Sequence, residues 1–452
     1  MIPLHRTLAL TGALALLAAC AERGPVGLPG GTWRVVLAVP GGDLPLGMEV
    51  EGDPESPEVY FINGAERVRV PEVTIDGKRV ALVLTGFSNR IDATLDGDTL
   101  VGTLTLIKSY GEQRIPFRAV HGETHRFFAD EPARFADFAG RWAMRFKDQD
   151  GGTYEAVGEF EQDGTTVTGT ILTPTGDYRF LAGEARDDRL YLSTFDGAHV
   201  YLFEAAVEPD GSLAGDYWSG TAWHETWTAE RDEQAALPDA MAMTFLKEGY
   251  DELDFSFPDP GGRRVSLSDP RFDGKVLVVT LAGSWCPNCR DEAVFLAPFY
   301  AQNRDRGLEV IALMYEHFGD FEEAAAATRR WRDELGIEYT TLIAGISDKV
   351  EAGKTLPMLN GVLAFPTTIF IDRAGRVRNI HTGFTGPGTG EHYETFKREF
   401  TALVDELLAE PAQTGHSAES PRPRHSGESR NPVLSSHWTP ASAGATNYSE
   451  VA

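Results

Sequence analysis

A chain of 452 residues is too long for one ordinary hydrophobic core, and at roughly 100 to 200 residues per domain it should form two to four folding units. Its hydrophobic share of 42% with 10% aromatic residues can fill packed cores, which excludes a chain that is disordered throughout. A formal net charge of -27 argues against electrostatic binding to nucleic acid or to an anionic membrane surface, because both need a basic patch.

The N-terminus has the pattern of a signal peptide. His5 and Arg6 precede an apolar run over residues 8–19, which is shorter than the roughly 20 residues that span a bilayer. Leu17-Ala18-Ala19-Cys20 resembles the bacterial lipobox, so residues 1–20 are predicted to be a lipoprotein signal peptide and Cys20 to receive a lipid. The alternative is a plain secretory peptide. Ala21 stands where an acidic residue would retain a lipoprotein in the inner membrane, which slightly favours the outer membrane.

After a Gly- and Pro-containing tether over residues 21–30, the pattern changes to short β-type runs separated by Asp-Gly turns. Gly31-Thr32-Trp33 is echoed by Gly140-Arg141-Trp142, which suggests an internal duplication. We therefore predict an all-β region of two antiparallel barrel or sandwich units, over residues 31–128 and 133–232. The predicted strands are 32–39, 58–63, 80–84, 99–108, 153–161, 165–172, 189–194 and 199–207.

Aromatic and histidine side chains in the second β unit raise the possibility of a ligand pocket or metal site. Alternating aromatics in strands are more often core residues or cross-strand pairs, so the core interpretation is favoured. His199 and His224 are far apart in sequence and have no obvious carboxylate partner, so no metal is expected. The aromatic residues in question are Tyr201, Trp218, Trp223 and Trp227.

Beyond a linker over residues 233–250, strand-like and helix-like segments alternate, which is typical of an α/β sandwich. The predicted strands are 276–282, 308–314, 340–344, 368–372 and 377–382, and the predicted helices are 286–304, 321–335 and 391–408. Residues 411–452 are rich in Ser, Pro, Ala and Gly without an apolar period, so they are predicted to be disordered.

Three cysteines are present, and with Cys20 assigned to lipid, Cys286 and Cys289 remain as a C-x-x-C pair. The pair lies where a buried strand passes into a helix, so free N–H groups and the helix dipole can stabilise a thiolate at Cys286. Cys289 is within disulfide reach and can resolve a mixed disulfide formed at Cys286. A buried structural disulfide, or two inert thiols, is the alternative.

The dipeptide Phe365-Pro366 immediately precedes a predicted strand. A proline in that place is an expected site of a cis peptide bond, and the neighbouring backbone could pair with an extended substrate segment opposite the cysteines.

Together these motifs resemble the TlpA/ResA-like thioredoxin-fold disulfide oxidoreductases of bacterial envelopes, over residues 251–410. The resemblance implies a thioredoxin-like fold for about a third of the chain. The matching pieces are Asp254-Phe255-Ser256-Phe257, Val265-Ser266-Leu267-Ser268-Asp269, Gly274-Lys275-Val276, Ser284-Trp285-Cys286-Pro287-Asn288-Cys289-Arg290-Asp291-Glu292, Phe365-Pro366-Thr367-Thr368 and Asp372-Arg373-Ala374-Gly375.

The resemblance also implies roles for single residues. Glu292, one helical turn after Cys289, should tune or shuttle the proton of the dithiol, although a glutamate merely favoured in a first helical turn is the alternative. Thioredoxin itself carries a buried Asp where this chain has Thr280, which makes Glu292 the better candidate. Pro366 completes the expected catalytic set. Trp285, Phe365 and Thr367 are the expected substrate-binding residues.

The activity implied is reduction of disulfides in envelope proteins through a Cys286–Cys289 redox disulfide. The implied partner is a membrane thiol–disulfide donor of the DsbD/CcdA type, with no cofactor and a periplasm-facing, lipid-anchored location. One alternative is a peroxiredoxin-like peroxidase, which normally needs a Thr-x-x-Cys motif. A second is a ligand-binding β region with the thioredoxin-like domain as a docking scaffold. The segment 281–284, Leu-Ala-Gly-Ser, departs from the more aromatic family pattern.

Overall fold

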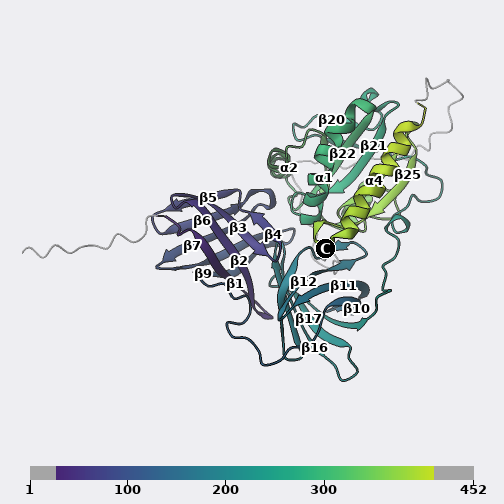
Figure 1. The fold of residues 1–452 in the computed structure, drawn as a ribbon. Helices are drawn as coiled ribbons and strands as arrows, with labels where there is room; N and C mark the ends of the chain where they lie inside the picture. The colour runs from purple at the N-terminus through teal and green to yellow at the C-terminus, as the bar shows by residue number, and fades with distance from the viewer. Residues whose placement is uncertain (1–26, 412–452) are drawn as a thin grey trace, which may run out of the picture.

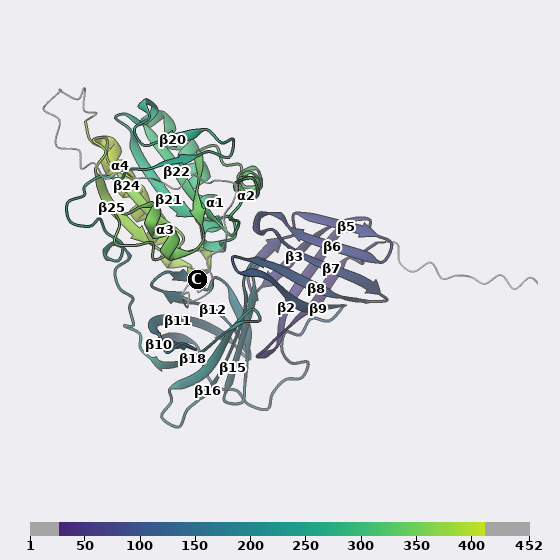
Figure 2. The ribbon, with the colours of Figure 1, turned by 180° about the vertical axis from the view of Figure 1, so that it is seen from behind.

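The computed structural model describes residues 27–411, in which two all-β bodies precede a thioredoxin-like α/β domain (Figures 1 and 2). The predicted signal peptide, the lipidation site Cys20 and the tail from residue 412 lie outside the described residues. Among residues 27–411, no helix is both long and apolar enough to cross a membrane.

The first β body is one antiparallel sheet of nine strands, in the order β4-β3-β2-β1-β9-β8-β7-β6-β5. Alternation of buried and exposed residues along β1 and β7 places one face of this sheet on a core. A short 3-10 helix, η1 (Thr85–Phe87), follows β6. The strands are β1 (Gly31–Val39), β2 (Gly42–Asp53), β3 (Ser56–Asn63), β4 (Glu66–Arg69), β5 (Glu72–Asp76), β6 (Arg79–Leu84), β7 (Asn89–Asp96), β8 (Thr99–Lys108) and β9 (Gly111–His121).

The second β body is also antiparallel, but its ladder closes because β12 pairs with both β11 and β14. A closed ladder leaves no exposed edge in the ring, which defines a barrel. The strands are β10 (Gly140–Asp148), β11 (Thr153–Asp163), β12 (Thr166–Thr173), β13 (Gly176–Asp177), β14 (Leu181–Arg186), β15 (Arg189–Phe195), β16 (Val200–Val207), β17 (Leu213–Ser219) and β18 (Trp223–Arg231).

The all-β region is therefore present, while its origin by duplication stays a prediction. The two bodies differ in closure, since β4 and β5 end the first sheet without pairing to each other. Tyr201 and Trp227 are buried in the barrel core, whereas Trp218 packs against the core of the first body. The two histidines do have carboxylate partners, which the sequence had not suggested: His199 contacts Asp196 at 3.0 Å and His224 contacts Asp216 at 2.8 Å.

The C-terminal domain is built on a five-stranded sheet in the order β23-β22-β21-β24-β25. The first three of these strands are parallel, and β24 and β25 are antiparallel to their neighbours. A small hairpin of β19 (Ser256–Pro258) and β20 (Arg264–Ser266) precedes the sheet. The remaining elements are β21 (Val276–Ala282), α1 (Pro287–Asn303), β22 (Leu308–Glu316), α2 (Phe321–Leu335), β23 (Thr340–Ile346), α3 (Lys349–Thr355), β24 (Thr367–Ile371), β25 (Val377–Thr382) and α4 (Glu391–Ala409).

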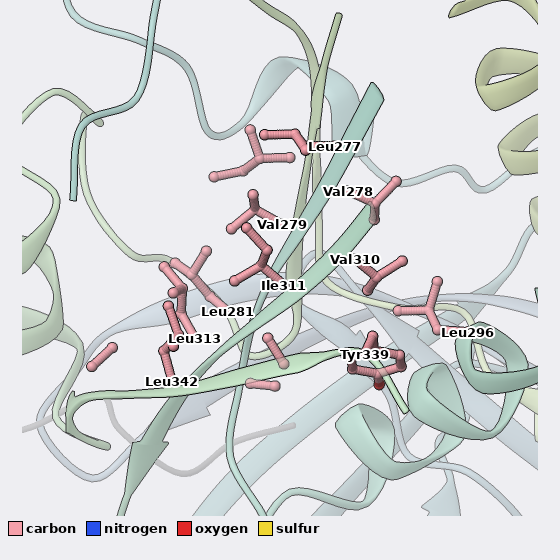
Figure 3. Close-up of a cluster of buried hydrophobic side chains, with 14 of the residues drawn as sticks. Leu277, Val278, Val279, Leu281, Leu296, Val310, Ile311, Leu313, Tyr339 and Leu342 are labelled. Atoms are coloured by element: carbon pink, nitrogen blue, oxygen red, sulfur yellow. The ribbon is translucent and has the colours of Figure 1, made fainter. Parts of the chain in front are cut away.

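The central strand β21 is buried along its whole length, which explains its uninterrupted apolar sequence. Figure 3 shows Val278 and Val310 of adjacent strands lying toward Leu296 of α1. Helix α4 closes the domain with an apolar stripe that includes Phe396 and Phe400. These contacts hold β21 and α1 in a rigid frame, and the cysteine motif lies where the one passes into the other.

The segment predicted as a linker, residues 233–250, contacts the thioredoxin-like domain toward its end. The Thr244 backbone N–H donates to the Thr382 hydroxyl oxygen at 3.1 Å, and Lys247 N–H donates to the Met358 carbonyl at 2.8 Å. The approach to the α/β domain is thus fixed by hydrogen bonds before residue 251.

Candidate active site

The cysteine motif begins in a tight connection between β21 and α1. Gly283 is needed there because an added Cβ would lie 2.2 Å from the Trp285 ring nitrogen and 2.7 Å from the Tyr315 carbonyl oxygen. The Trp285 ring N–H donates to that same carbonyl at 2.8 Å. The glycine that follows the predicted strand therefore makes room for the indole of Trp285.

Cys286 is the N-cap of α1, and Pro287 is the first residue of the helix. The Cys289 backbone N–H donates to Cys286 Sγ at 3.2 Å, so the sulfur fills the place that a serine or aspartate oxygen takes in an ordinary cap. A helix N-terminus directs positive potential at this atom, which stabilises negative charge on the sulfur during thiol exchange.

Both thiols are free and buried, with exposed fractions of 3% for Cys286 and 1% for Cys289. The Cys286 thiol donates to the Phe365 carbonyl at 3.4 Å. Burial raises the pKa of Cys289 well above its ordinary value, and the adjacent Cys286 sulfur adds to the effect. The two sulfurs are thus unequal: Cys286 is supported by an N–H donor, and Cys289 stays protonated until a base removes its proton.

Glu292 lies in the second turn of α1 and is 1% exposed. The hydroxyls of Thr280 and Thr368 donate to its two oxygens, the first at 2.5 Å. These threonines are directly paired across β21 and β24, so the sheet register brings both hydroxyls to one carboxyl. Burial raises the pKa of Glu292 to about 7, and its charge in turn raises the pKa of Cys289. A carboxyl that titrates near neutral pH beside the second cysteine can accept or return its proton.

A second buried carboxyl, which no motif in the sequence indicated, contacts the residue Ser284 in front of the cysteine motif. Glu316 ends β22, and Ser284 donates to it through both the backbone N–H, at 3.2 Å, and the hydroxyl, at 2.7 Å. Thr328 of α2 donates at 3.3 Å, and burial raises the pKa of Glu316 to about 7. The sequence signal that could have indicated this carboxyl is the position of Glu316 directly after the apolar run of a buried strand. Its contacts fix the residue two positions before Cys286.

The predicted residues around the dithiol are brought together, but most of their side chains face inward. The Phe365–Pro366 peptide bond is cis, as the sequence predicted. Phe365 is buried between Trp285 and Tyr315, at ring distances of 5.8 and 5.4 Å. Thr367 is fully buried and donates to the Ala364 carbonyl at 2.9 Å. Of the three predicted substrate-binding side chains, Trp285 alone is partly exposed.

Lys349, at the start of α3, is a further group that the sequence did not single out. Burial lowers the pKa of this lysine to about 8, while the negative charge available at Cys286 acts in the opposite direction. Lys349 is thus a cation whose charge interacts with that of the first cysteine. The isolated lysine in the connection after β23 carried no motif from which this could be read.

Comparisons with known proteins match this part of the chain. The Redoxin family model matches residues 247–395. Thiol-disulfide oxidoreductase ResA of Bacillus subtilis is 25% identical over 138 residues, which is 30% of this chain and 69% of that protein. Thioredoxin-like protein YneN of the same organism is 28% identical over 138 residues, or 73% of its length. The crystal structure of a putative thiol:disulfide interchange protein DsbE from Chlorobium tepidum is 24% identical, covers 35% of this chain and 99% of that one, and has a TM-score of 0.28.

A dithiol that caps the helix after a central strand, faces a cis-proline and matches these relatives defines a thiol–disulfide oxidoreductase of the thioredoxin family. Within that class, residues 247–395 are similar to TlpA/ResA-like thioredoxin-fold proteins, and a large all-β region precedes them in this chain.

Proposed function

We propose that this chain reduces disulfide bonds of envelope proteins through Cys286 and Cys289. The Cys286 thiolate attacks one sulfur of the substrate disulfide, a mixed disulfide forms, and the other substrate sulfur leaves as a thiolate. Cys289 gives its proton to Glu292 and attacks Cys286 Sγ. The mixed disulfide breaks, the Cys286–Cys289 bond forms, and the second substrate thiolate leaves and takes up a proton. Two electrons pass to the substrate.

The observation that carries this proposal is the unequal pair of sulfurs. The N–H donor at 3.2 Å supports charge on Cys286, while the raised pKa of Cys289 and a carboxyl titrating near 7 equip Cys289 for the second, base-assisted step. A peroxidase would need a threonine three residues before its cysteine, and this chain has Gly283 there. A membrane thiol–disulfide donor of the DsbD/CcdA type would restore the dithiol.

The reduction potential of the Cys286–Cys289 pair tests the direction of electron flow. We expect a value near that of thioredoxin, about -270 mV, when the full chain with Cys20→Ser is equilibrated in dithiothreitol buffers and the free thiols are trapped. The Cys20 substitution leaves two cysteines to be counted. A potential near -120 mV, roughly that of a dedicated disulfide-forming protein, would contradict the reductive role.

The proposed location is the periplasmic side of a membrane, with the outer membrane slightly favoured, through a lipid on Cys20. The lipobox-like residues 17–20 and the Gly- and Pro-containing stretch after them support this proposal. Intact-mass analysis of the mature chain from membranes should give the mass of a chain that begins at Cys20 and carries a diacylglycerol. A mature chain without lipid would contradict the anchor.

A further inference from the structure

The connection between β12 and β14, residues 174–180, here called the barrel loop, lies directly against the dithiol site. In Figure 1, β12 lies in the part of the barrel that is nearest to the thioredoxin-like domain. The side-chain amide of Asn288, between the two cysteines, donates to the Asp177 carbonyl at 3.3 Å. The Gly386 backbone N–H donates to the Asp177 carboxylate at 2.7 Å. Asp177 thus bonds to the cysteine motif and to the segment after β25.

Backbone meets backbone along this contact. An added Cβ at Gly383 would lie 2.7 Å from the Thr175 carbonyl carbon, and one at Gly388 would lie 2.7 Å from that of Arg179. Gly383 N–H also donates to the Pro366 carbonyl at 3.0 Å, so the segment against which the loop packs is attached to the cis-proline. The barrel loop therefore contacts two chain segments that border the sulfur of Cys286.

Arg179 anchors the barrel loop at the junction of all three bodies. Its guanidinium pairs with Glu66 of the first body, with Asp291 of α1, and with Asp196 of the barrel at 3.5 Å. It also donates to the Pro287 carbonyl at 3.4 Å. The side chain is 10% exposed, and its backbone φ of 57° is one that non-glycine residues rarely adopt. Such a conformation persists only where surrounding contacts determine it.

The hydrophobic packing indicates which of the bodies can separate. The core of the first β body includes Phe195 and Leu202 of the barrel, so the two β bodies share one apolar cluster. The core of the redox domain contains only residues from 246 onward. Its other contacts with the β region are polar as well: His392 contacts Glu159 of the barrel at 2.9 Å. At a second, exposed contact, Arg330 donates to Ser88 at 2.9 Å and Thr85 donates to Glu334 at 3.2 Å. Polar interfaces between domains of one chain commonly open.

We propose that the barrel loop is the specificity element of the dithiol: it admits small disulfides to Cys286 and excludes folded proteins until the redox domain separates from the barrel at Arg179. This inference rests on the proposed function for the nature of the substrate. Cys286 and Asn288 are each 3% exposed under the loop, so no protein surface can dock on them in the closed arrangement. The Arg179–Asp291 pair joins the two bodies and acts as the latch.

Thiol labelling by reagents of two sizes tests the proposal on the reduced full chain. N-ethylmaleimide and a maleimide on a long polyethylene glycol chain are compared, and peptide mapping identifies label at Cys286. The ratio of the two rates cancels any change in the intrinsic reactivity of the thiol. We expect Asp291→Asn to raise the ratio of large to small reagent about tenfold, because a buried ion pair across the interface is lost.

Glu66→Gln is the matched control, because it also removes one carboxylate from Arg179 but on the side of the β region. Its ratio should stay near that of the unaltered chain. Equal ratios of large-reagent to small-reagent labelling in the two variants would overturn the proposal. It would also be overturned if the large reagent labelled Cys286 of the unaltered chain as fast as that of the urea-unfolded chain. If Asp291→Asn does not fold, Arg330→Gln at the exposed second contact replaces it, and an unchanged ratio there contradicts the gate.

Labelling needs no redox turnover, so the labelling result can contradict the gating proposal independently of the proposed reductase function. If labelling of Cys286 depends on the size of the maleimide but the Asp291→Asn chain cannot reduce a protein disulfide, the barrel loop is a gate and the reductase function is contradicted. If the chain reduces insulin at the same rate with and without Asp291→Asn, the reductase function is supported and the gate is contradicted.

Discussion

Replacing Cys289 by serine should arrest the exchange at the mixed disulfide and lower the turnover of a protein disulfide by roughly 10³-fold or more, since the resolving thiolate is lost. Cys286, with its N–H donor at 3.2 Å, remains able to attack. The variant should therefore accumulate as a covalent adduct with its substrate. Non-reducing electrophoresis followed by mass mapping of the linked peptides measures this adduct.

Cys286→Ser is the matched substitution at the first cysteine, and it should lose turnover to the same extent without forming an adduct. The difference follows from the cap geometry, in which the helix N–H points at Cys286 and not at Cys289. An adduct through Cys289 in the Cys286→Ser chain would reverse the proposed roles. Activity retained when both cysteines are replaced would remove the dithiol mechanism altogether.

Glu292→Gln should make the redox domain more stable at pH 8 and leave it unchanged near pH 4. The folded pKa of about 7 lies above the ordinary 4.5, so the folded state holds a proton that the unfolded state has lost between these values. The free energy of unfolding therefore falls as the pH rises from 4.5 to 7. At about 1.4 kcal/mol per pKa unit, the loss is about 3 kcal/mol at pH 8, and a neutral amide avoids it.

Urea unfolding at the two pH values, followed by the helical circular dichroism signal, measures this difference. Within residues 27–411, α1 to α4 all belong to the redox domain, so the signal reports on that domain. Thr280 and Thr368 can accept as well as donate, so the amide keeps partners. Glu399→Gln on the exposed side of α4 is the control and should leave the pH dependence intact. A Glu292→Gln chain with the unaltered pH dependence would contradict the assignment.

Local patterns predicted the redox domain better than the β region. In the redox domain, long apolar runs mark the parallel strands, because these are buried on both faces. In the first β body, β3, β6 and β8 were predicted from β-branched runs, but β2 and β9 were not. Pro45 and Gly47 interrupt β2, and Pro116 interrupts β9, and such residues argue against a strand unless the sheet accommodates them.

The sequence by itself determined those parts of the site that lie close together along the chain. They are a C-x-x-C pair at a strand-to-helix junction, Phe365-Pro366 before a strand, and Glu292 one turn after Cys289. These features depend on spacing within one or two elements, which local periodicity encodes. The tertiary structure alone decided that Glu316 meets Ser284 and that Arg179 meets Asp291, 112 residues away. Such contacts arise from sheet register and from the docking of whole bodies, and no local pattern specifies them.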